Sequence, residues 1–430
     1  MIQKQKRPGA MSSYAWVILA LLFVGHLMVF GMRSAFGAYI THWEAEFSIS
    51  RTVVTTISLV GMAVFATFQP FMGKLNDLWG RGVILTVGVV LVGGSLFLTS
   101  LVTEVWQIFA VYGVILFIGL ACCTNAVVAA TTTSWFSKRR GLALGLVMSG
   151  MAVGNSILYP VNIYVIETMG WRTSMGTLGL IILVIVGPLF AIFMRSKPEE
   201  KGLKPYGYEE SDSTETGVSE NVALPVKSEP FIRIFRQKAI WLLMIPYFIC
   251  GLTDVGIIHT HFIPMMGPEG RGFPEMTVAA VLSVIAILNI AGTIVTGYLS
   301  DHFNLKRQLA VIYSVRAVSI IFLVLLDQPW LLFVFAVMFG AVEMASIAPV
   351  NAITIKLFDS YSPGVILGII ALSHQLGGAA GSWIPGIIYD LTGSYTIILL
   401  ISAVLLLVAA GLSLMIRVPE KKALEQQTHS

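Results

Sequence analysis

Four charged side chains interrupt long apolar stretches of this sequence: Arg33, Asp254, Arg316 and Glu343. Even on a lenient insertion scale, an arginine or aspartate at the centre of an apolar helix costs about 2.5–3.5 kcal/mol. A chain keeps such groups where they meet an opposite charge, a water-filled cavity or an ionic ligand. Arg33 is a candidate ligand for an organic anion, since a guanidinium stays charged and binds a carboxylate through two hydrogen bonds. The alternative is a structural ion pair with Asp254 or Glu343.

The two acids are candidates for carrying a proton. Asp254 is the first choice, because a carboxyl group in an apolar environment can take up and release a proton under physiological conditions. A permanent ion pair is the alternative for Asp254. Glu343 is either a second proton site or the fixed partner of Arg316, and we favour the pairing.

Polar groups without a fixed charge stand in the same apolar stretches. Asn125, Asn289 and Gln375 offer amide donors and acceptors, and His374 offers an imidazole that can donate to a carboxylate. We therefore predict a substrate-binding set of Arg33 with these four residues. The alternative for His374 is a hydrogen-bonded side chain that packs two helices.

The composition indicates that membrane-spanning helices position these residues. Of the 430 residues, 56% are hydrophobic and 12% are charged, and the mean hydropathy is +0.83. Soluble domains carry about 25% charged residues. The apolar runs are about 20 residues long, which suits a helix that crosses a bilayer. They lack the alternation of barrel strands.

Other classes of function find no support in the sequence. The net charge of +4 comes from short basic loops rather than a basic stripe, which excludes a nucleic-acid partner. The three cysteines show no metal or disulfide spacing. No nucleophile, metal or phosphate-binding motif appears, so we expect no cofactor, no metal and no enzyme activity.

The runs predict an all-α polytopic membrane protein with twelve transmembrane helices in two six-helix halves. The halves cover 15–196 and 239–417, with a polar linker at 197–238 and tails at 1–14 and 418–430. The linker composition cannot bury a core. The expected spans are 15–40, 52–72, 82–101, 104–129, 141–165, 173–194, 240–266, 276–298, 308–327, 330–357, 362–388 and 393–417.

The basic residues set the orientation of the chain. With the N-terminus in the cytoplasm, Arg51, Arg172 and Arg271 fall outside, and Arg33 and Arg316 fall within helices. The other lysines and arginines are then cytoplasmic, as the positive-inside rule requires. Both termini and the linker are therefore expected in the cytoplasm, in a cell inner (plasma) membrane.

Two related loops indicate an internal repeat. Each joins the second and third helices of its half, and each carries glycine, aspartate and arginine that can bridge helix ends at a cytoplasmic gate. An ordinary charged loop is the alternative. The first copy contains Gly73, Asp77, Gly80 and Arg81, and the second contains Gly297, Asp301 and Arg307.

These motifs resemble those of the major facilitator superfamily. The Gly-x-Leu-x-Asp-x-x-Gly-Arg pattern at 73–81 is similar to the loop signature of that superfamily. The stretch WFSKRRGLALGLVMSG at 135–150 resembles the helix-5 signature of the monocarboxylate porters and the oxalate–formate antiporters. The resemblance implies that helices 1, 4, 7 and 10 line a cavity. Those helices hold Arg33, Asn125, Asp254 and Glu343.

The chain also departs from those families. Asn289 and Thr293 stand where monocarboxylate porters carry an aspartate and an arginine on helix 8. His374 and Gln375 stand where the oxalate–formate antiporters carry a lysine on helix 11. The coupling mechanism of the families therefore does not transfer to this chain.

The resemblance implies a monomeric secondary transporter in the lipid bilayer. We expect alternating-access transport of a small organic anion, a monocarboxylate, with proton symport. The alternatives are a carboxylate exchanger without proton coupling, an exporter of amphipathic compounds and a receptor-like sensor.

Overall fold

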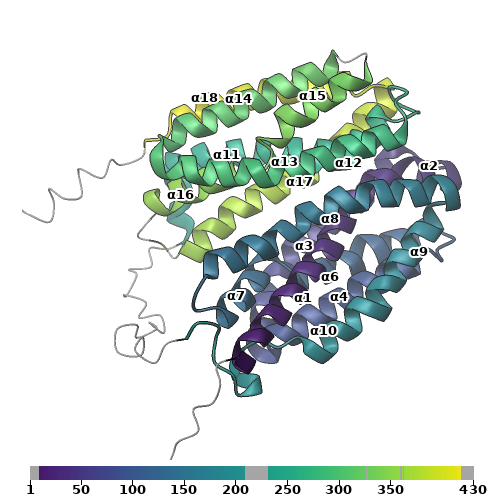
Figure 1. Ribbon diagram of the computed structural model, residues 1–430. Helices are drawn as coiled ribbons and strands as arrows, with labels where there is room; N and C mark the ends of the chain where they lie inside the picture. Colours follow the sequence, from purple (N-terminus) through teal and green to yellow (C-terminus); the bar gives the residue numbers. More distant parts are fainter. Residues whose placement is uncertain (1–8, 209–230, 326–327, 359–360, 362, 418–430) are drawn as a thin grey trace, which may run out of the picture. The chain divides into compact units, whose positions relative to one another are not determined.

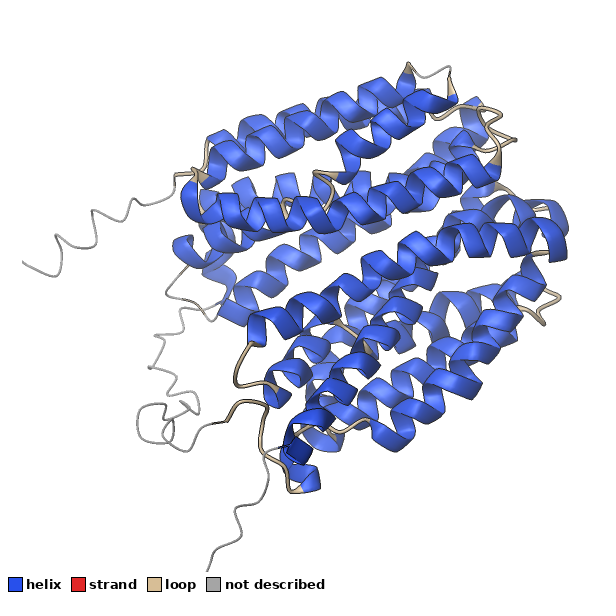
Figure 2. Cartoon of the chain, in the orientation of Figure 1, coloured by secondary structure: helices blue, strands red, loops and turns tan. Residues whose placement is uncertain are grey.

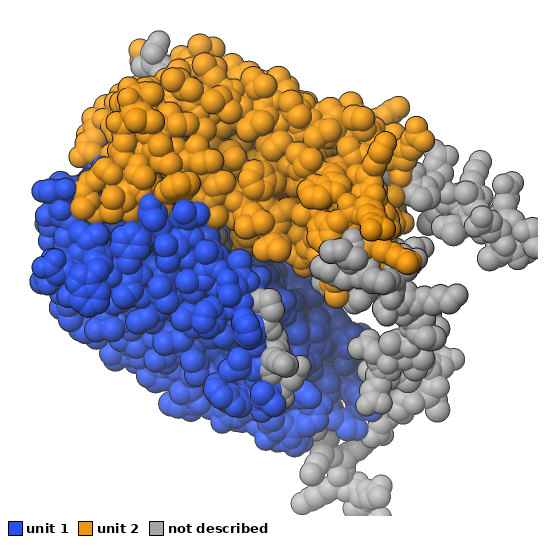
Figure 3. Space-filling model, turned by 180° about the vertical axis from the view of Figure 1, so that it is seen from behind, with its two compact units in different colours: residues 1–48, 56–221 blue, residues 49–55, 222–430 orange. Residues whose placement is uncertain are grey.

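The computed structural model describes residues 9–208, 231–325, 328–358, 361 and 363–417, and within them the chain is helical (Figures 1 and 2). Among the described residues, eleven helical spans are long and apolar enough to cross a membrane, and some of them join several of the helices named below. The chain divides into two compact units (Figure 3). Unit 1 comprises residues 1–48 and 56–221, and unit 2 comprises residues 49–55 and 222–430.

The described part of unit 1 contains ten α-helices and several short helical segments. The α-helices are α1 Gly9–Ser34, α2 Ile40–Phe47, α3 Arg51–Trp79 (beyond its first turn), α4 Arg81–Thr99, α5 Val105–Ile108, α6 Phe117–Cys122, α7 Asn125–Trp135, α8 Arg140–Met169, α9 Trp171–Ile181 and α10 Gly187–Phe193. The segments are the 3-10 turns η1 Ala35–Tyr39 and η4 Pro198–Lys201, and the π-helices η2 Phe109–Leu116 and η3 Ile182–Val186.

Within the described residues, unit 2 has eight α-helices and two short segments. The α-helices are α11 Lys238–Gly251, α12 His259–Met266, α13 Glu275–His302, α14 Leu305–Val324, α15 Pro329–Gly340, α16 Ile347–Leu357, α17 Pro363–Thr392 and α18 Thr396–Leu414. The segments are the 3-10 turn η6 Phe231–Arg236 and the π-helix η7 Leu252–Ile258.

The tenth expected span differs from its prediction. The sequence predicts one helix at 330–357, but the chain forms α15 and α16 with turns at 341–346 between them. Gly292 of α13 approaches this break so closely that a Cβ there would overlap the carbonyl of Ala341. The first span also changes, because the predicted helix at 15–40 leaves α-geometry at Ala35.

A close seam between α17 and the α11–η7 segment positions one polar side chain. A Cβ on Gly251 would overlap the carbonyl oxygen of His374, and a Cβ on Gly377 would overlap that of Phe248. Small residues allow such close helix packing in membrane proteins. The seam therefore fixes the backbone of His374 against the segment that contains Asp254.

The start of the predicted linker packs on unit 1. Tyr206 pairs through its backbone with Phe136, and its ring lies 5.7 Å from that of Trp16. The ammonium of Lys201 lies 4.1 Å from the ring centroid of Tyr14. The rest of the linker, from residue 209 to residue 230, lies outside the described residues.

The first turn of α3 belongs to unit 2 and is held there by a carboxylate. Asp390 of α17 accepts hydrogen bonds from the backbone N–H groups of Arg51 (3.2 Å) and Thr52 (2.8 Å). The guanidinium of Arg51 lies 3.9 Å from the Tyr389 ring centroid. Asp390 therefore acts as a tertiary cap for the free N–H groups of this helix.

Replacing this cap is expected to lower stability. Asp390→Ala leaves the first N–H groups of α3 without their acceptor, and a lost cap costs about 1 kcal/mol. Thermal unfolding in detergent measures the effect. Glu269→Gln is the matched control, because Glu269 is exposed and lies 3.9 Å from Arg51, and exposed pairs contribute little. An unchanged melting temperature for Asp390→Ala would contradict the cap.

A second surface contact predicts a pH dependence. Glu46 of α2 accepts hydrogen bonds from the indole of Trp171 (2.6 Å) and the guanidinium of Arg172 (2.6 Å) at the start of α9. Partial burial raises the pKa of Glu46, but these hydrogen bonds and the charge of Arg172 outweigh it, so the pKa lies below its usual value. The contact therefore stabilises the folded state when Glu46 is ionised.

The sign of the pH effect follows from this lowered pKa. The stabilisation is present above the pKa of Glu46 in the unfolded chain and is lost as the pH falls through its pKa in the folded state. Thermal unfolding at several pH values should show a smaller acid-induced loss for Glu46→Gln than for the wild type. Glu167→Gln, which changes an exposed acid on α8, should follow the wild-type curve.

Candidate functional site

Asp254 lies at the centre of a buried polar cluster in unit 2. Its side chain is 1% exposed. The Oδ2 atom lies 3.3 Å from Nε2 of His374, 3.7 Å from Nη1 of Arg316 and 3.6 Å from Sγ of Cys250. These partners come from α17, α14 and α11. The Tyr247 ring packs 4.7 Å from the imidazole of His374.

The π-helix η7 explains how one segment supplies two polar residues to this cluster. The backbone N–H of His259 bonds to the carbonyl of Asp254, five residues earlier. In an α-helix, residues five apart point in different directions, since each residue turns the helix by about 100°. The wider turn of a π-helix brings them closer to the same face. Asp254 and His259 therefore both face the interior of unit 2.

Arg316 joins the cluster to the break in the tenth span. Its side chain is fully buried, and Nη1 lies 2.9 Å from Sγ of Cys250. Nη2 donates to the carbonyl oxygens of Val342 (3.1 Å) and Glu343. Two turn carbonyls thus receive hydrogen bonds from a cation, and that of Val342 also accepts a bond from the backbone N–H of Ala345 at 3.3 Å.

The Glu343 carboxylate has different partners from those we favoured. We predicted that it pairs with Arg316, but that guanidinium contacts the Glu343 carbonyl and the Asp254 carboxylate instead. Glu343 Oε1 lies 2.7 Å from Nε2 of His259, and Oε2 accepts a hydrogen bond from Asn289. Because the break turns the Glu343 side chain toward α12 and α13, its carboxylate and its carbonyl serve different neighbours.

The predicted substrate set is only partly brought together. His374 and Asn289 belong to unit 2, where they contact the two acids, and Gln375 is the next, half-buried residue of α17. Asn125 is exposed at the start of α7 in unit 1. Arg33 is in the last turn of α1, and its side chain lies outside the described residues.

The predicted gate motif is described in part. Gly73 belongs to α3, and the side chains of Asp77 and Asp301 lie outside the described residues. Gly80 has φ +84°, a left-handed conformation that favours glycine, and Arg81 donates to Ser134 at 2.8 Å. Arg307 is exposed, and its backbone N–H bonds to the side chain of Asn304.

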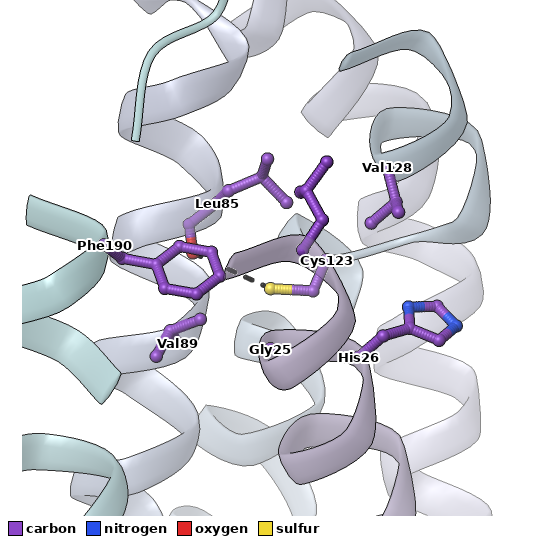
Figure 4. Close-up of a pocket in the computed structure, with 8 residues that line it drawn as sticks. Gly25, His26, Leu85, Val89, Cys123, Val128 and Phe190 are labelled. Carbon is purple, nitrogen blue, oxygen red and sulfur yellow. Dashed lines mark hydrogen bonds between the residues drawn. The ribbon is translucent and has the colours of Figure 1, made fainter. Parts of the chain in front are cut away.

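Unit 1 contains cavities of very different size. One, of about 600 Å³, is lined by Arg81 of the gate motif together with Asn76 and Lys197. The other lies beside His26 and Cys123 and measures about 10 Å³ (Figure 4). The smaller cavity is at the limit for one water molecule, so it cannot hold an organic substrate.

The cluster around Asp254 also contains three potential metal ligands. The ligand atoms of Cys250, Asp254 and His374 lie within 4.8 Å of one another. However, Arg316 already contacts the thiol and the carboxylate. A metal cation at this position would meet the guanidinium charge, so we interpret the group as an ion-pair cluster.

Sequence reasoning missed two members of this site. Neither Cys250, which contacts Asp254 and Arg316, nor His259, which contacts Glu343, is among the predicted site residues. The position of Cys250 carries a weak signal, since this residue precedes Asp254 by one α-helical turn. No feature of the sequence predicts the π-turn that brings His259 to the face on which Asp254 lies.

Comparisons with known proteins agree with the fold. The family model described as Major Facilitator Superfamily matches residues 22–382. An uncharacterized MFS-type transporter, YcxA of Bacillus subtilis (strain 168), is 24% identical over 96% of this chain and 97% of its own length. Monocarboxylate transporter 13 of Rattus norvegicus is 24% identical over 96% and 90%, and monocarboxylate transporter 12 of Homo sapiens is 22% identical over 89% and 76%.

A solved structure shows the same fold. The bacterial homolog of the human lysosomal transporter Spinster, in an inward-facing and unoccupied conformation, superposes with a TM-score of 0.71 at 15% identity, covering 96% of this chain and 97% of its own. These comparisons and the helices confirm the predicted all-α membrane fold. They also agree with the expectation of a transporter rather than an enzyme.

Removing the Arg316 charge should destabilise unit 2. Arg316→Met leaves Asp254 buried without its cation, a change that costs about 3–5 kcal/mol. Thermal unfolding in detergent measures the loss. Adding Asp254→Asn should restore part of the melting temperature, because the unpaired charge is then gone. The exposed Arg236→Gln is the control, and a wild-type melting temperature for Arg316→Met would refute this role.

Proposed function

The chain belongs to the Major Facilitator Superfamily and is a multi-pass membrane transporter of small molecules, and from this premise we propose that it carries a small organic anion together with a proton by alternating access. The proposed substrate is a monocarboxylate. The proposed location is a cell inner membrane with both termini in the cytoplasm, and the proposed functional unit is a monomer.

Charge balance in the core of unit 2 is the observation that supports proton coupling. Arg316 and Asp254 form a pair that is neutral when Asp254 is ionised. Glu343 adds a second carboxylate, whose oxygens contact His259 and Asn289 rather than a lysine or arginine. A buried, uncompensated charge costs several kcal/mol. One added proton removes this imbalance.

The substrate assignment is supported by the predicted cation and by the relatives. Arg33 remains the proposed carboxylate ligand, with Asn125, His374 and Gln375 as further contacts. His374 is 17% exposed and contacts Asp254, so it can offer a hydrogen bond to an anion without leaving the cluster. Two of the relatives named above are monocarboxylate transporters.

Exchange of one carboxylate for another is the second candidate function. Asn289 and Thr293 occupy the positions where monocarboxylate porters carry their helix-8 acid and arginine. An exchanger needs an anion site but no proton site. Counterflow of a labelled carboxylate without any dependence on a pH gradient would favour this function.

Proteoliposome uptake tests the proposal. With the outside more acidic, labelled pyruvate or lactate should accumulate inside vesicles that contain the wild-type protein. Arg33→Gln should reduce uptake about tenfold or more, because a charge-assisted pair with the carboxylate is lost. Arg236→Gln, an exposed arginine on η6, is the control.

Two results would reject the proposal. Absence of pH-gradient-driven uptake for a panel of monocarboxylates would reject proton symport. Normal uptake by Arg33→Gln would reject the anion site.

A further inference from the structure

We propose that Glu343 and His259 together hold the transported proton, and that Asp254 does not. This inference rests on the proposed proton coupling and names the residues that perform it. The two groups meet at Oε1 of Glu343 and Nε2 of His259, which are 2.7 Å apart, an ion-pair distance when the imidazole carries the proton.

The two side chains differ in access to solvent. The Glu343 side chain is 0% exposed and that of His259 is 14% exposed. The histidine is therefore the member of the pair that can exchange a proton with water. Once bound, the proton forms either an imidazolium beside a carboxylate or an imidazole beside a carboxylic acid, and both forms of the pair are neutral.

The second carboxylate oxygen is also held in place. Asn289 of α13 donates its amide N–H to Oε2 of Glu343. An amide donor bonds to either protonation form of the carboxyl group and adds no charge. The site therefore keeps its geometry while its net charge changes from zero with the proton to minus one without it.

Asp254 differs because a permanent cation contacts it. Arg316 lies 3.7 Å from its carboxylate and keeps its charge at every physiological pH. The ionised form of Asp254 is thus balanced by Arg316 alone, without a proton on His374. Glu343 has no such contact with the guanidinium, which bonds to its carbonyl. At Glu343 the proton neutralises the negative charge of the carboxylate. At Asp254 the charge of Arg316 already does so.

The position of Glu343 in the chain connects its charge to the fold. It stands in the turns at 341–346 between α15 and α16 rather than in a regular helix. The titratable or charged groups that contact it are His259, at the carboxylate, and Arg316, at the carbonyl. Arg316 in turn contacts Cys250 and Asp254, and Asp254 contacts His374.

The test separates proton coupling from substrate movement. Wild type and variants are reconstituted in proteoliposomes, and two quantities are measured with labelled pyruvate or lactate. The first is accumulation driven by a one-unit pH gradient, which reaches about tenfold for one proton per anion. The second is counterflow exchange at equal pH, which needs the anion site but no net proton movement.

Glu343→Gln keeps the size of the side chain and cannot carry the proton. We expect its accumulation ratio to fall to about one, while counterflow stays within about threefold of the wild type. His259→Gln should show the same separation. Glu167→Gln, an exposed acid on α8, is the matched control and should retain both activities.

Each result is decisive. Wild-type accumulation by Glu343→Gln would overturn the assignment and leave the proposed function standing. If Glu343→Gln loses both activities, the result for His259→Gln is used instead. Loss of accumulation alone in His259→Gln supports the assignment, and any other result for that variant overturns it. Absence of pH-gradient-driven accumulation in the wild-type protein would instead reject the proposed function itself.

Discussion

The buried guanidinium of Arg316 is the group on which the rest of the site depends. It lies against the thiol of Cys250 and the carboxylate of Asp254, and it donates to the carbonyls of Val342 and Glu343. A break in a membrane-spanning helix exposes backbone carbonyls that water cannot satisfy. Arg316 supplies those hydrogen bonds and balances one acid. The carboxylate of the neighbouring acid, Glu343, contacts His259 and the side-chain amide of Asn289 instead.

Three of the candidate-site residues lie at departures from α-helical geometry. Asp254 lies in the π-helix η7, Glu343 in the turns at 341–346, and Asn125 directly after the break at 123–124. Irregular backbone at membrane depth occurs where it is buried in protein or lines a cavity. In unit 2 these departures bring two acids and His259 to one interior region, where His374 of the regular helix α17 also lies.

The sequence was sufficient for the fold and insufficient for the pairing of charges. Runs of about 20 apolar residues and the motif at 135–150 predicted the helices and the family, because hydropathy and local signatures depend on sequence alone. The partner of Arg316 could not be predicted, since it depends on how α14 is rotated against η7. The break around Glu343 was also invisible, because its carbonyls are satisfied by a side chain distant in sequence.

The contacts of His259 in unit 2 depend on the backbone geometry of η7 as well as on which residues are present. Its hydrogen bond from His259 to Asp254 encloses one residue more than an α-helical bond would. If the same residues closed as a regular α-helix, everything that follows would turn by about 100° about the helix axis. His259 would then leave Glu343 although no residue of the pair had changed.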